Sequence, residues 1–298
     1  MLLADLAPAF SWNPLTDLQE MWAFPFMVNA FRAGTVVAVL AGAIGWFMVL
    51  RGESFAGHTL ASVAFPGAAG ATLLGIGALY GYFAFCVAAA LVIAASSRTG
   101  RGGTGEAAAL TGTVQALLLA AGFLFVALYR GFLGGVNALL FGSFMGITSD
   151  QVLVLAVVAV AVLAVLGCIG RPLLFASVDP DVAAARGVPV RALSTGFLVL
   201  LGAATAGTSQ ITGTLLVFAL LVMPPAAARA ITARPGAGIA LSVLIALGVT
   251  WAGLVAAYYS PYPLGFYVTG FAFALCLLCR GYRLLADRAG GPRQRSTR

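Results

Sequence analysis

Long apolar runs that carry almost no charge recur along this chain and limit its fold more than any other feature. Hydrophobic residues make up 61% of the 298 residues, and charged residues make up only 8%. A soluble domain carries about a quarter charged residues, so this surface cannot face water everywhere. The runs are continuous instead of alternating, which argues against a membrane β-barrel. The composition therefore predicts an all-α polytopic membrane protein.

Glycine, proline and charge divide the apolar runs into nine candidate spans. Nine spans of roughly 20 residues would use about 180 residues and leave no room for a separate soluble catalytic domain. The third candidate is short and the sixth is rich in small residues, so a count of eight is the alternative. The candidates are residues 33–50, 58–79, 82–95, 107–128, 152–170, 192–208, 211–232, 237–258 and 264–279.

We expect one transmembrane domain over residues 1–298. It would consist of a membrane bundle (24–280), a polar insert between two spans (171–191) and a basic tail (281–298). The first basic residue is Arg32, and no charged start followed by an apolar core precedes it, so no signal peptide is expected.

The sixteen basic residues are all arginine, and their positions predict the orientation of the chain. With nine spans and a cytoplasmic C-terminus, all of them except Arg32 and Arg130 fall on the cytoplasmic side, in agreement with the positive-inside rule. The N-terminus would then lie outside. We interpret the basic tail as a topology signal that contacts lipid headgroups, not as a nucleic-acid site.

The absence of lysine excludes two kinds of chemistry. A Walker A nucleotide loop ends in Gly-Lys-Ser/Thr, so any ATP hydrolysis must occur on another polypeptide, and a Schiff-base lysine is excluded too. The four cysteines lie in apolar stretches, and the CxxC of Cys276 and Cys279 has no second ligand pair. Neither a disulfide framework nor a zinc site is therefore expected. We therefore expect a chain that binds no cofactor of its own and is not an enzyme.

The candidate spans contain very few ionisable residues, which bears on the source of energy. Carriers coupled to protons or ions usually need buried carboxylates or histidines to bind the coupling ion. Their scarcity favours an external energy source. An autonomous secondary carrier or a passive channel is the alternative, although no selectivity-filter pattern is evident.

The single histidine, His58, lies where the second candidate span begins. Ser62 follows one helical turn later, on the same face of the helix. An ionisable group within a span is by default a candidate functional site, and imidazole is a common metal ligand. The alternative is a histidine that bonds to a neighbouring backbone carbonyl. With one histidine, a tetrahedral zinc cage from this chain alone is not expected.

The polar insert carries the signals of a short helix. Asp179, Pro180 and Asp181 would begin it, with acid and proline at its positive end, and Gly187 would end it before Pro189. A short capped helix between two spans suits docking into a groove of a partner protein. The alternative is a mere connecting loop.

Two other segments interrupt the spans. Residues 138–150 are apolar but short and interrupted by glycine, which suggests a re-entrant or interfacial piece.

Gln210 belongs to a polar group between the sixth and seventh spans, which would line an aqueous vestibule or cap two helix ends at an extracellular turn. Pro224 and Pro225 are expected to kink the seventh span. The other members of the polar group are Thr205, Thr208, Ser209, Thr212 and Thr214.

Several motifs, in their order and spacing, are similar to those of one family of transporters. On these motifs the chain resembles, over nearly its whole length, the permease subunits of ATP-binding-cassette (ABC) importers for zinc, manganese or iron. The motifs are residues 24–31, 49–52, 54–60 with 65–67, 139–143 with Asp150, 179–191 and 213–229.

The resemblance implies a homodimer in a bacterial plasma membrane that works by alternating access. A cytoplasmic ABC ATPase would bind and hydrolyse ATP, and an extracytoplasmic binding protein would deliver a divalent metal: zinc or manganese, or iron. The ATPase would dock on the insert, through Asp179, Asp181, Arg186 and Gly187. His58 would contact the metal transiently, with Ser62 and Gln210 along the pathway.

The second-helix motif departs from the family pattern. The family carries Asp or His and then Ser-His before Pro-Gly, and the first and last of these, four apart, are its metal-contacting gate. Here the first position is His58, but Ala61 and Ser62 stand where the Ser-His pair is expected. Two His58 side chains across a dimer axis would restore a transient site. The alternative is a permease for a chelated metal or a small organic ligand.

Overall fold

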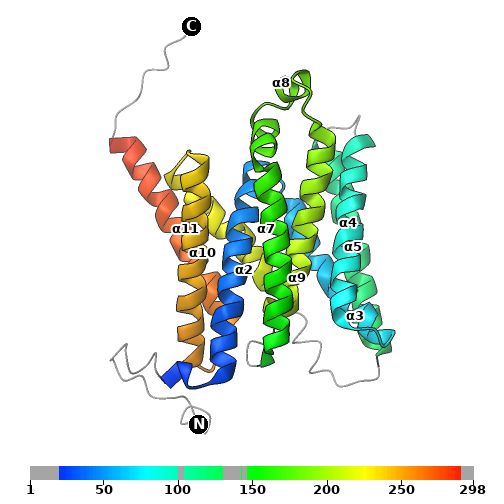
Figure 1. The fold of residues 1–298 in the computed structure, drawn as a ribbon, viewed down its shortest axis with the longest axis vertical. Coiled ribbons are helices and arrows are strands. Elements are labelled where there is room, and N and C mark those ends of the chain that lie inside the picture. The colour runs from blue at the N-terminus through cyan, green and yellow to red at the C-terminus, as the bar shows by residue number, and fades with distance from the viewer. Residues whose placement is uncertain (1–19, 100–103, 130–141, 143–145, 290–298) are drawn as a thin grey trace.

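The computed structural model describes residues 20–99, 104–129, 142 and 146–289. All regular secondary structure in this part is helical, which confirms the predicted fold class. Seven of the described helices are long and apolar enough to cross a membrane. Figure 1 shows them side by side in one bundle. The helices are α2 (Pro25–Leu50), α3 (Ser54–Leu73), α4 (Ala78–Thr99), α5 (Thr104–Leu128), α7 (Ser149–Val178), α8 (Pro180–Ala185), α9 (Val190–Ile231), α10 (Pro235–Tyr258) and α11 (Leu264–Ala289).

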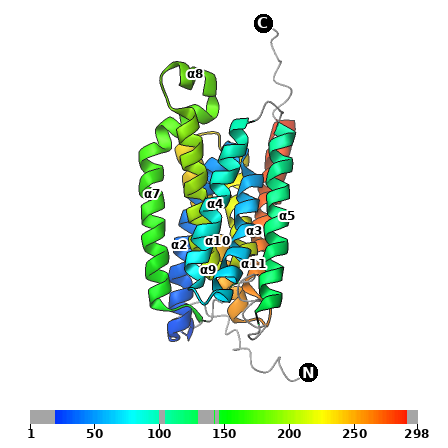
Figure 2. The same ribbon diagram turned by 90° about the vertical axis from the view of Figure 1, so that its right-hand side faces the viewer.

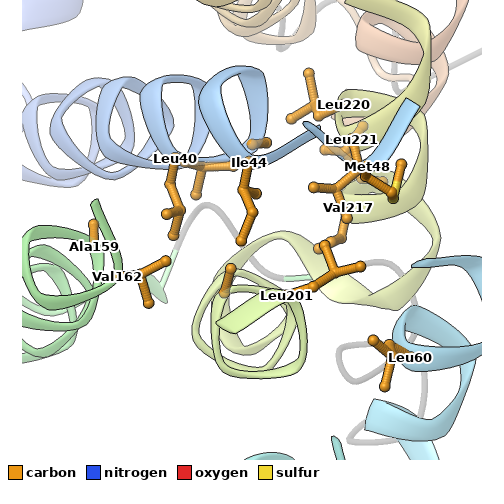
Figure 3. Close-up of a cluster of buried hydrophobic side chains, with 14 of the residues drawn as sticks. Leu40, Ile44, Met48, Leu60, Ala159, Val162, Leu201, Val217, Leu220 and Leu221 are labelled. Atoms are coloured by element: carbon orange, nitrogen blue, oxygen red, sulfur yellow. The ribbon is translucent and has the colours of Figure 1, made fainter. Parts of the chain in front are cut away.

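The bundle is built around α2 and α9, which bury most of their length. Most residues of both helices are apolar or small, as expected where a helix is surrounded by other helices. The view in Figure 3 shows α2 packed against α9 through aliphatic side chains. Those side chains are almost completely buried: Leu40, Ile44, Met48, Leu201, Val217, Leu220 and Leu221.

The peripheral helices present large apolar side chains on the outside of the bundle. In water such a surface would cause aggregation, whereas in a bilayer it contacts lipid tails at no cost. The exposed residues come from α5, α7, α10 and α11 and include Leu117, Phe123, Leu153, Val160, Leu244, Phe273 and Leu278.

Helix α9 reverses direction at Gly213, whose φ of 73° and ψ of 162° are the only non-helical dihedral angles inside it. Before this residue, Gly207 packs on Val158 of α7; after it, Pro225 packs on Gly45 of α2. Figures 1 and 2 show both ends of α9 toward the end of the bundle from which α8 projects. The predicted spans 192–208 and 211–232 are therefore two arms of one element.

The reversal does not coincide with the prolines of the second arm. Pro224 and Pro225 keep helical backbone dihedral angles, and the kink expected at them stays a prediction. A glycine with positive φ can reverse the chain at no steric cost, whereas proline keeps a helical φ and only removes a donor. The reversal therefore occurs at Gly213.

The polar insert is shorter than its predicted range of 171–191. Helix α7 continues to Val178 with Pro172 inside it, so only residues 179–189 lie between α7 and α9. The start of α7 is defined by a capping box between Thr148 and Gln151. Of the predicted re-entrant segment 138–150, only residue 142 and residues 146–150 are described; the remainder lies outside the described residues.

The arginine-bearing helix ends lie together at the α8 end of the bundle. Arg32, near the start of α2, lies toward the opposite end (Figure 1). This excess of arginine at one end is the pattern the positive-inside rule describes. Which compartment each end faces, and the number of crossings, stay predictions. The arginines near the α8 end are Arg51, Arg171, Arg186, Arg191, Arg229, Arg234, Arg280 and Arg283.

Candidate translocation and docking sites

His58 lies in the first turns of α3, with its ring against Phe218 in the second arm of α9. The two ring centroids are 4.6 Å apart, in an edge-on arrangement. The Nδ1 atom of His58 is buried and has no hydrogen-bond partner among the described residues. An unsatisfied buried nitrogen is uncommon, because its desolvation is not compensated, and such an atom is available to a ligand.

Gln115 of α5 joins the His58 region through two hydrogen bonds to α3. Its Nε2 donates to Ser62 Oγ at 3.3 Å, and its Oε1 accepts from Thr59 Oγ1 at 2.9 Å. Ser62 Oγ in turn donates to the backbone oxygen of His58 at 2.9 Å. The structure thus brings the predicted pair His58 and Ser62 together and adds an amide that sequence reasoning missed.

The sequence does not identify Gln115 as a site residue, because the residues around it are those of an ordinary membrane span. It lies between Val114 and Ala116, inside the predicted segment 107–128. The only signal was the presence of an amide among apolar residues, since an uncharged polar side chain in a span usually bonds to another helix.

Gln210 lies in the first arm of α9, just before the break, and is partly exposed. Among the described residues, no hydrogen bond links it to His58, Ser62 or Gln115. Its role in a pathway therefore stays a prediction, and the site described by the contacts consists of His58, Ser62, Thr59 and Gln115.

Three threonine hydroxyls that precede Gly213 are buried and bond within α9, whereas Ser209 Oγ is buried without a partner among the described residues. Thr205, Thr208 and Thr212 donate to the carbonyl oxygens one turn earlier, at 2.7, 2.8 and 2.9 Å, and all three are buried. Such back-bonding satisfies a hydroxyl inside its own helix. Gly142 packs directly on the backbone of Thr212, so the turn is covered by protein, not placed at a surface.

The docking candidate is helix α8, which projects beyond the bundle (Figures 1 and 2). Asp179 caps it, since Oδ1 accepts from the backbone nitrogen of Val182 at 3.0 Å. Ala183 is fully buried and anchors the helix. The turn after it requires Gly187, whose φ is +81°. The predicted short helix is confirmed. The predicted docking residues Asp179, Asp181, Arg186 and Gly187 are all exposed.

The described residues offer no ready-made metal cage. Nowhere in that part of the chain do three or more His, Cys, Asp or Glu side chains gather closely enough to hold an ion. Cys276 and Cys279 are free thiols. A structural zinc site needs four such ligands, so a metal contact within the described part of the chain involves few ligands.

The fold and these sites define a class: a multi-pass membrane transport subunit with a polar site between its helices and an exposed helix at one end. A family model described as the ABC 3 transport family matches residues 23–280. The chain belongs to this family.

Individual relatives and a solved structure agree with this assignment. The chain is 27% identical over 239 residues to the manganese transport system membrane protein MntC of Listeria innocua, covering 80% of this chain and 82% of that protein. It is 27% identical over 253 residues to the chelated iron transport system membrane protein YfeC of Yersinia pestis, covering 85% and 82%. It is similar to a chain of PsaBC from Streptococcus pneumoniae in complex with Fab, with a TM-score of 0.80, 25% identity, and coverage of 92% and 99%.

Proposed function

We propose that the chain is the transmembrane subunit of an ATP-driven importer of divalent metal ions, zinc or manganese, or iron. The observation that carries this proposal is the family match over residues 23–280. The named functions of MntC and YfeC support a metal as the cargo. The importer would reside in a bacterial plasma membrane as a homodimer and work by alternating access.

The energy for import would come from a separate ATPase. The chain contains no lysine and therefore no Walker A loop, so it cannot cradle the phosphates of ATP in that way. Helix α8 would dock the ATPase, because its polar residues Asp179, Asp181 and Arg186 are exposed while Ala183 holds it to the bundle. The α8 end would then face the cytoplasm, as its arginines favour. A binding protein would deliver the metal at the other end.

The cargo would pass His58. Its unpartnered Nδ1 supplies the one imidazole ligand, and Ser62 and Gln115 supply oxygen atoms beside it. One imidazole with weak oxygen ligands gives brief contacts, and brief contacts suit conduction because tight binding slows release. A second His58 across the axis of a homodimer would complete a transient pair. We place Gln210 further along the same pathway.

A chelated metal is the second candidate. Ser62 stands where the resemblance expects histidine, so this chain offers half of the expected ligand pair. A chelated metal already has its ligands, so its recognition depends on hydrogen bonds to the chelator more than on imidazole ligands. Ser62 and Gln115 provide such hydrogen-bonding groups.

Reconstitution tests both candidates. The chain would be inserted in liposomes with its ATPase and binding protein, and manganese, zinc, iron and chelated iron would be compared for stimulated ATP hydrolysis and uptake. We expect one free divalent metal to stimulate both. Stimulation by the chelate alone would favour the second candidate. Full uptake by the purified chain without ATPase and ATP would instead indicate an autonomous carrier.

A further inference from the structure

Arg51, at the C-terminal end of α2, contacts three other elements of the bundle. Its Nε and Nη2 donate to Glu53 Oε1 at 3.0 and 2.9 Å. Its Nη1 donates to Ser177 Oγ at 3.2 Å, and its Nη2 donates to Ser194 Oγ at 2.7 Å. The guanidinium carbon also lies 5.3 Å from the ring centroid of Phe197. The side chain is only 9% exposed, so these contacts replace nearly all of its hydration.

The two serines flank the segment that carries α8. Ser177 lies at the end of α7, immediately before the insert 179–189, and Ser194 lies in the first turn of α9, immediately after it. One guanidinium therefore bridges both ends of the insert. Its planar fork of donors can bind several acceptors in fixed directions, which a lysine ammonium cannot reproduce.

Glu53 continues the connection into α3. It is the residue that precedes α3, and its backbone oxygen accepts from the nitrogen of Gly57, next to His58. Its own backbone nitrogen donates to the oxygen of Met48 in α2 at 3.0 Å. A Cβ on Gly57 would collide with the sulfur of Met48, so the start of α3 lies directly on α2. Glu53 is thereby hydrogen-bonded both to α2 and to the turn of α3 that carries His58.

The carboxylate of Glu53 is incompletely satisfied in this conformation. Oε1 accepts twice from Arg51, whereas Oε2 is buried and has no partner among the described residues. Burial raises the pKa of Glu53, and the hydrogen bond and charge of Arg51 lower it less. Burying an ion pair with one carboxylate oxygen unpaired costs free energy. Such a pair is retained where it fixes one particular packing of the surrounding helices.

We propose that Arg51 is the positioning residue that transmits movement of the α8 docking helix to α3 and its His58. The proposal rests on the proposed function, since it requires an ATPase bound to α8. When the ATPase moves α8, the ends of α7 and α9 move with it. The guanidinium, bonded to Ser177 and Ser194, would carry that movement through Glu53 to the first turns of α3. Rearrangement at His58 would then accompany the ATPase cycle.

The test uses the complete transporter in liposomes and measures ATP hydrolysis and metal uptake in the same vesicles. We expect Arg51→Gln to retain ATPase association and basal hydrolysis but to lower metal uptake per ATP by about threefold to thirtyfold, the range for changes along a coupling network. Arg51→Lys should recover only part of this ratio, because it keeps the charge and loses the fork. A residue that merely stabilised the fold would lower assembly, hydrolysis and uptake together.

Two further variants keep the test decisive if Arg51→Gln fails to assemble. The double variant Ser177→Ala/Ser194→Ala keeps the Arg51–Glu53 ion pair and should still lower uptake per ATP. The matched control Arg171→Gln removes an exposed arginine of α7 and should leave the ratio unchanged. An unchanged ratio in the double variant would overturn the proposal. A native complex that hydrolyses ATP without any metal uptake would overturn the proposed function itself.

Discussion

Gln115 of α5 donates a hydrogen bond from Nε2 to Ser62 Oγ of α3, at the position where the resemblance places a metal-contacting histidine. An amide–hydroxyl pair thus occupies the place of an imidazole. The pair fixes α5 to α3 beside His58. It also changes the chemistry of the site, because amide and hydroxyl oxygens bind borderline metals more weakly than imidazole does.

The first prediction concerns this amide. Gln115→Leu keeps the approximate size but removes both hydrogen bonds to α3, which should lower the free energy of unfolding by about 1 kcal/mol and raise the KM for metal uptake. Thermal unfolding in detergent and uptake kinetics in liposomes measure the two effects. The control is Thr113→Val on the same helix, whose exposed hydroxyl bonds only within α5. Equal KM values for native chain and Gln115→Leu would contradict a role in the pathway.

The second prediction concerns His58. Removing the imidazole in His58→Ala should lower metal uptake by about tenfold or more, the loss usual for groups that support a metal site. Assembly of the proposed homodimer and association with the proposed ATPase, measured by size-exclusion chromatography and co-purification, should persist. Thr72→Ala removes a polar side chain toward the far end of α3 and serves as the control. If uptake kinetics of His58→Ala matched those of the control, His58 would not lie on the pathway.

The third prediction concerns the turn after α8. Valine at Gly187 has open space but must adopt a φ of +81°, at a cost of about 1–2 kcal/mol. Relief of this strain would displace α8, so Gly187→Val should weaken ATPase association by about tenfold. The matched control is Gly75→Val, where φ is +72°, space is also open, and the turn lies after α3 at the other end of the bundle. Equal association of both variants with the ATPase would show that α8 is not the docking element.

The fourth prediction concerns the contact between α3 and α4. A Cβ on Gly81 would collide with the carbonyl oxygen of Gly67, and backbone atoms cannot move aside as a side chain does. Gly81→Ala should therefore lower the free energy of unfolding by about 1–3 kcal/mol. Gly248→Ala in α10 meets nothing within 4 Å and should be neutral or slightly stabilising. A melting temperature of Gly81→Ala at or above that of Gly248→Ala would refute the close approach.

The fifth prediction concerns the pH dependence of stability. Glu53 lies in the turn between α2 and α3, where burial raises its pKa above the ordinary value. The folded chain then holds this proton more tightly than the unfolded chain, so the contribution of Glu53 falls as pH rises from its ordinary pKa to its raised pKa. The amide in the Glu53→Gln variant cannot ionise, so this variant does not lose stability between the ordinary and the raised pKa of Glu53. Its melting temperature, relative to the native chain, should therefore increase as the pH rises above the ordinary glutamate pKa of about 4.

A difference in melting temperature that stays constant over this range, or that moves in favour of the native chain, would contradict the raised pKa. Thr113→Val changes no titratable group and provides the control. Its melting temperature relative to the native chain should not depend on pH over the same window.

Most of the helices could be predicted because apolar segments bounded by glycine, proline and charge leave few alternatives in a membrane. The boundaries were less predictable. Pro172 next to Arg171 suggested the end of a span, yet α7 continues through both to Val178. The missing i−4 hydrogen bond at one proline costs less than ending a long helix that packs along its length on α2 and α9.

The site was predictable only in part, because spacing reveals partners within one helix and not between helices. His58 and Ser62 share a face of α3 and could be paired from their separation of one turn. Gln115 lies on a different helix, and nothing in the sequence relates its position to that of Ser62. Similarly, Arg51 could be placed at the end of a span, whereas its contacts with Ser177 and Ser194 depend on how α7 and α9 pack.

The buried reversal at Gly213 bears on how the chain is made. The backbone of such a turn lacks helical hydrogen-bond partners, and lipid supplies none, so the turn needs surrounding protein before it can rest inside a bilayer. Its neighbours Gly45, Gly142 and Val158, which cover the turn and the two arms, all precede α9 in the sequence. During synthesis they leave the ribosome first. The order in which the segments are translated therefore provides α9 with part of its packing surface before it emerges, and α10 and α11 complete that surface afterwards.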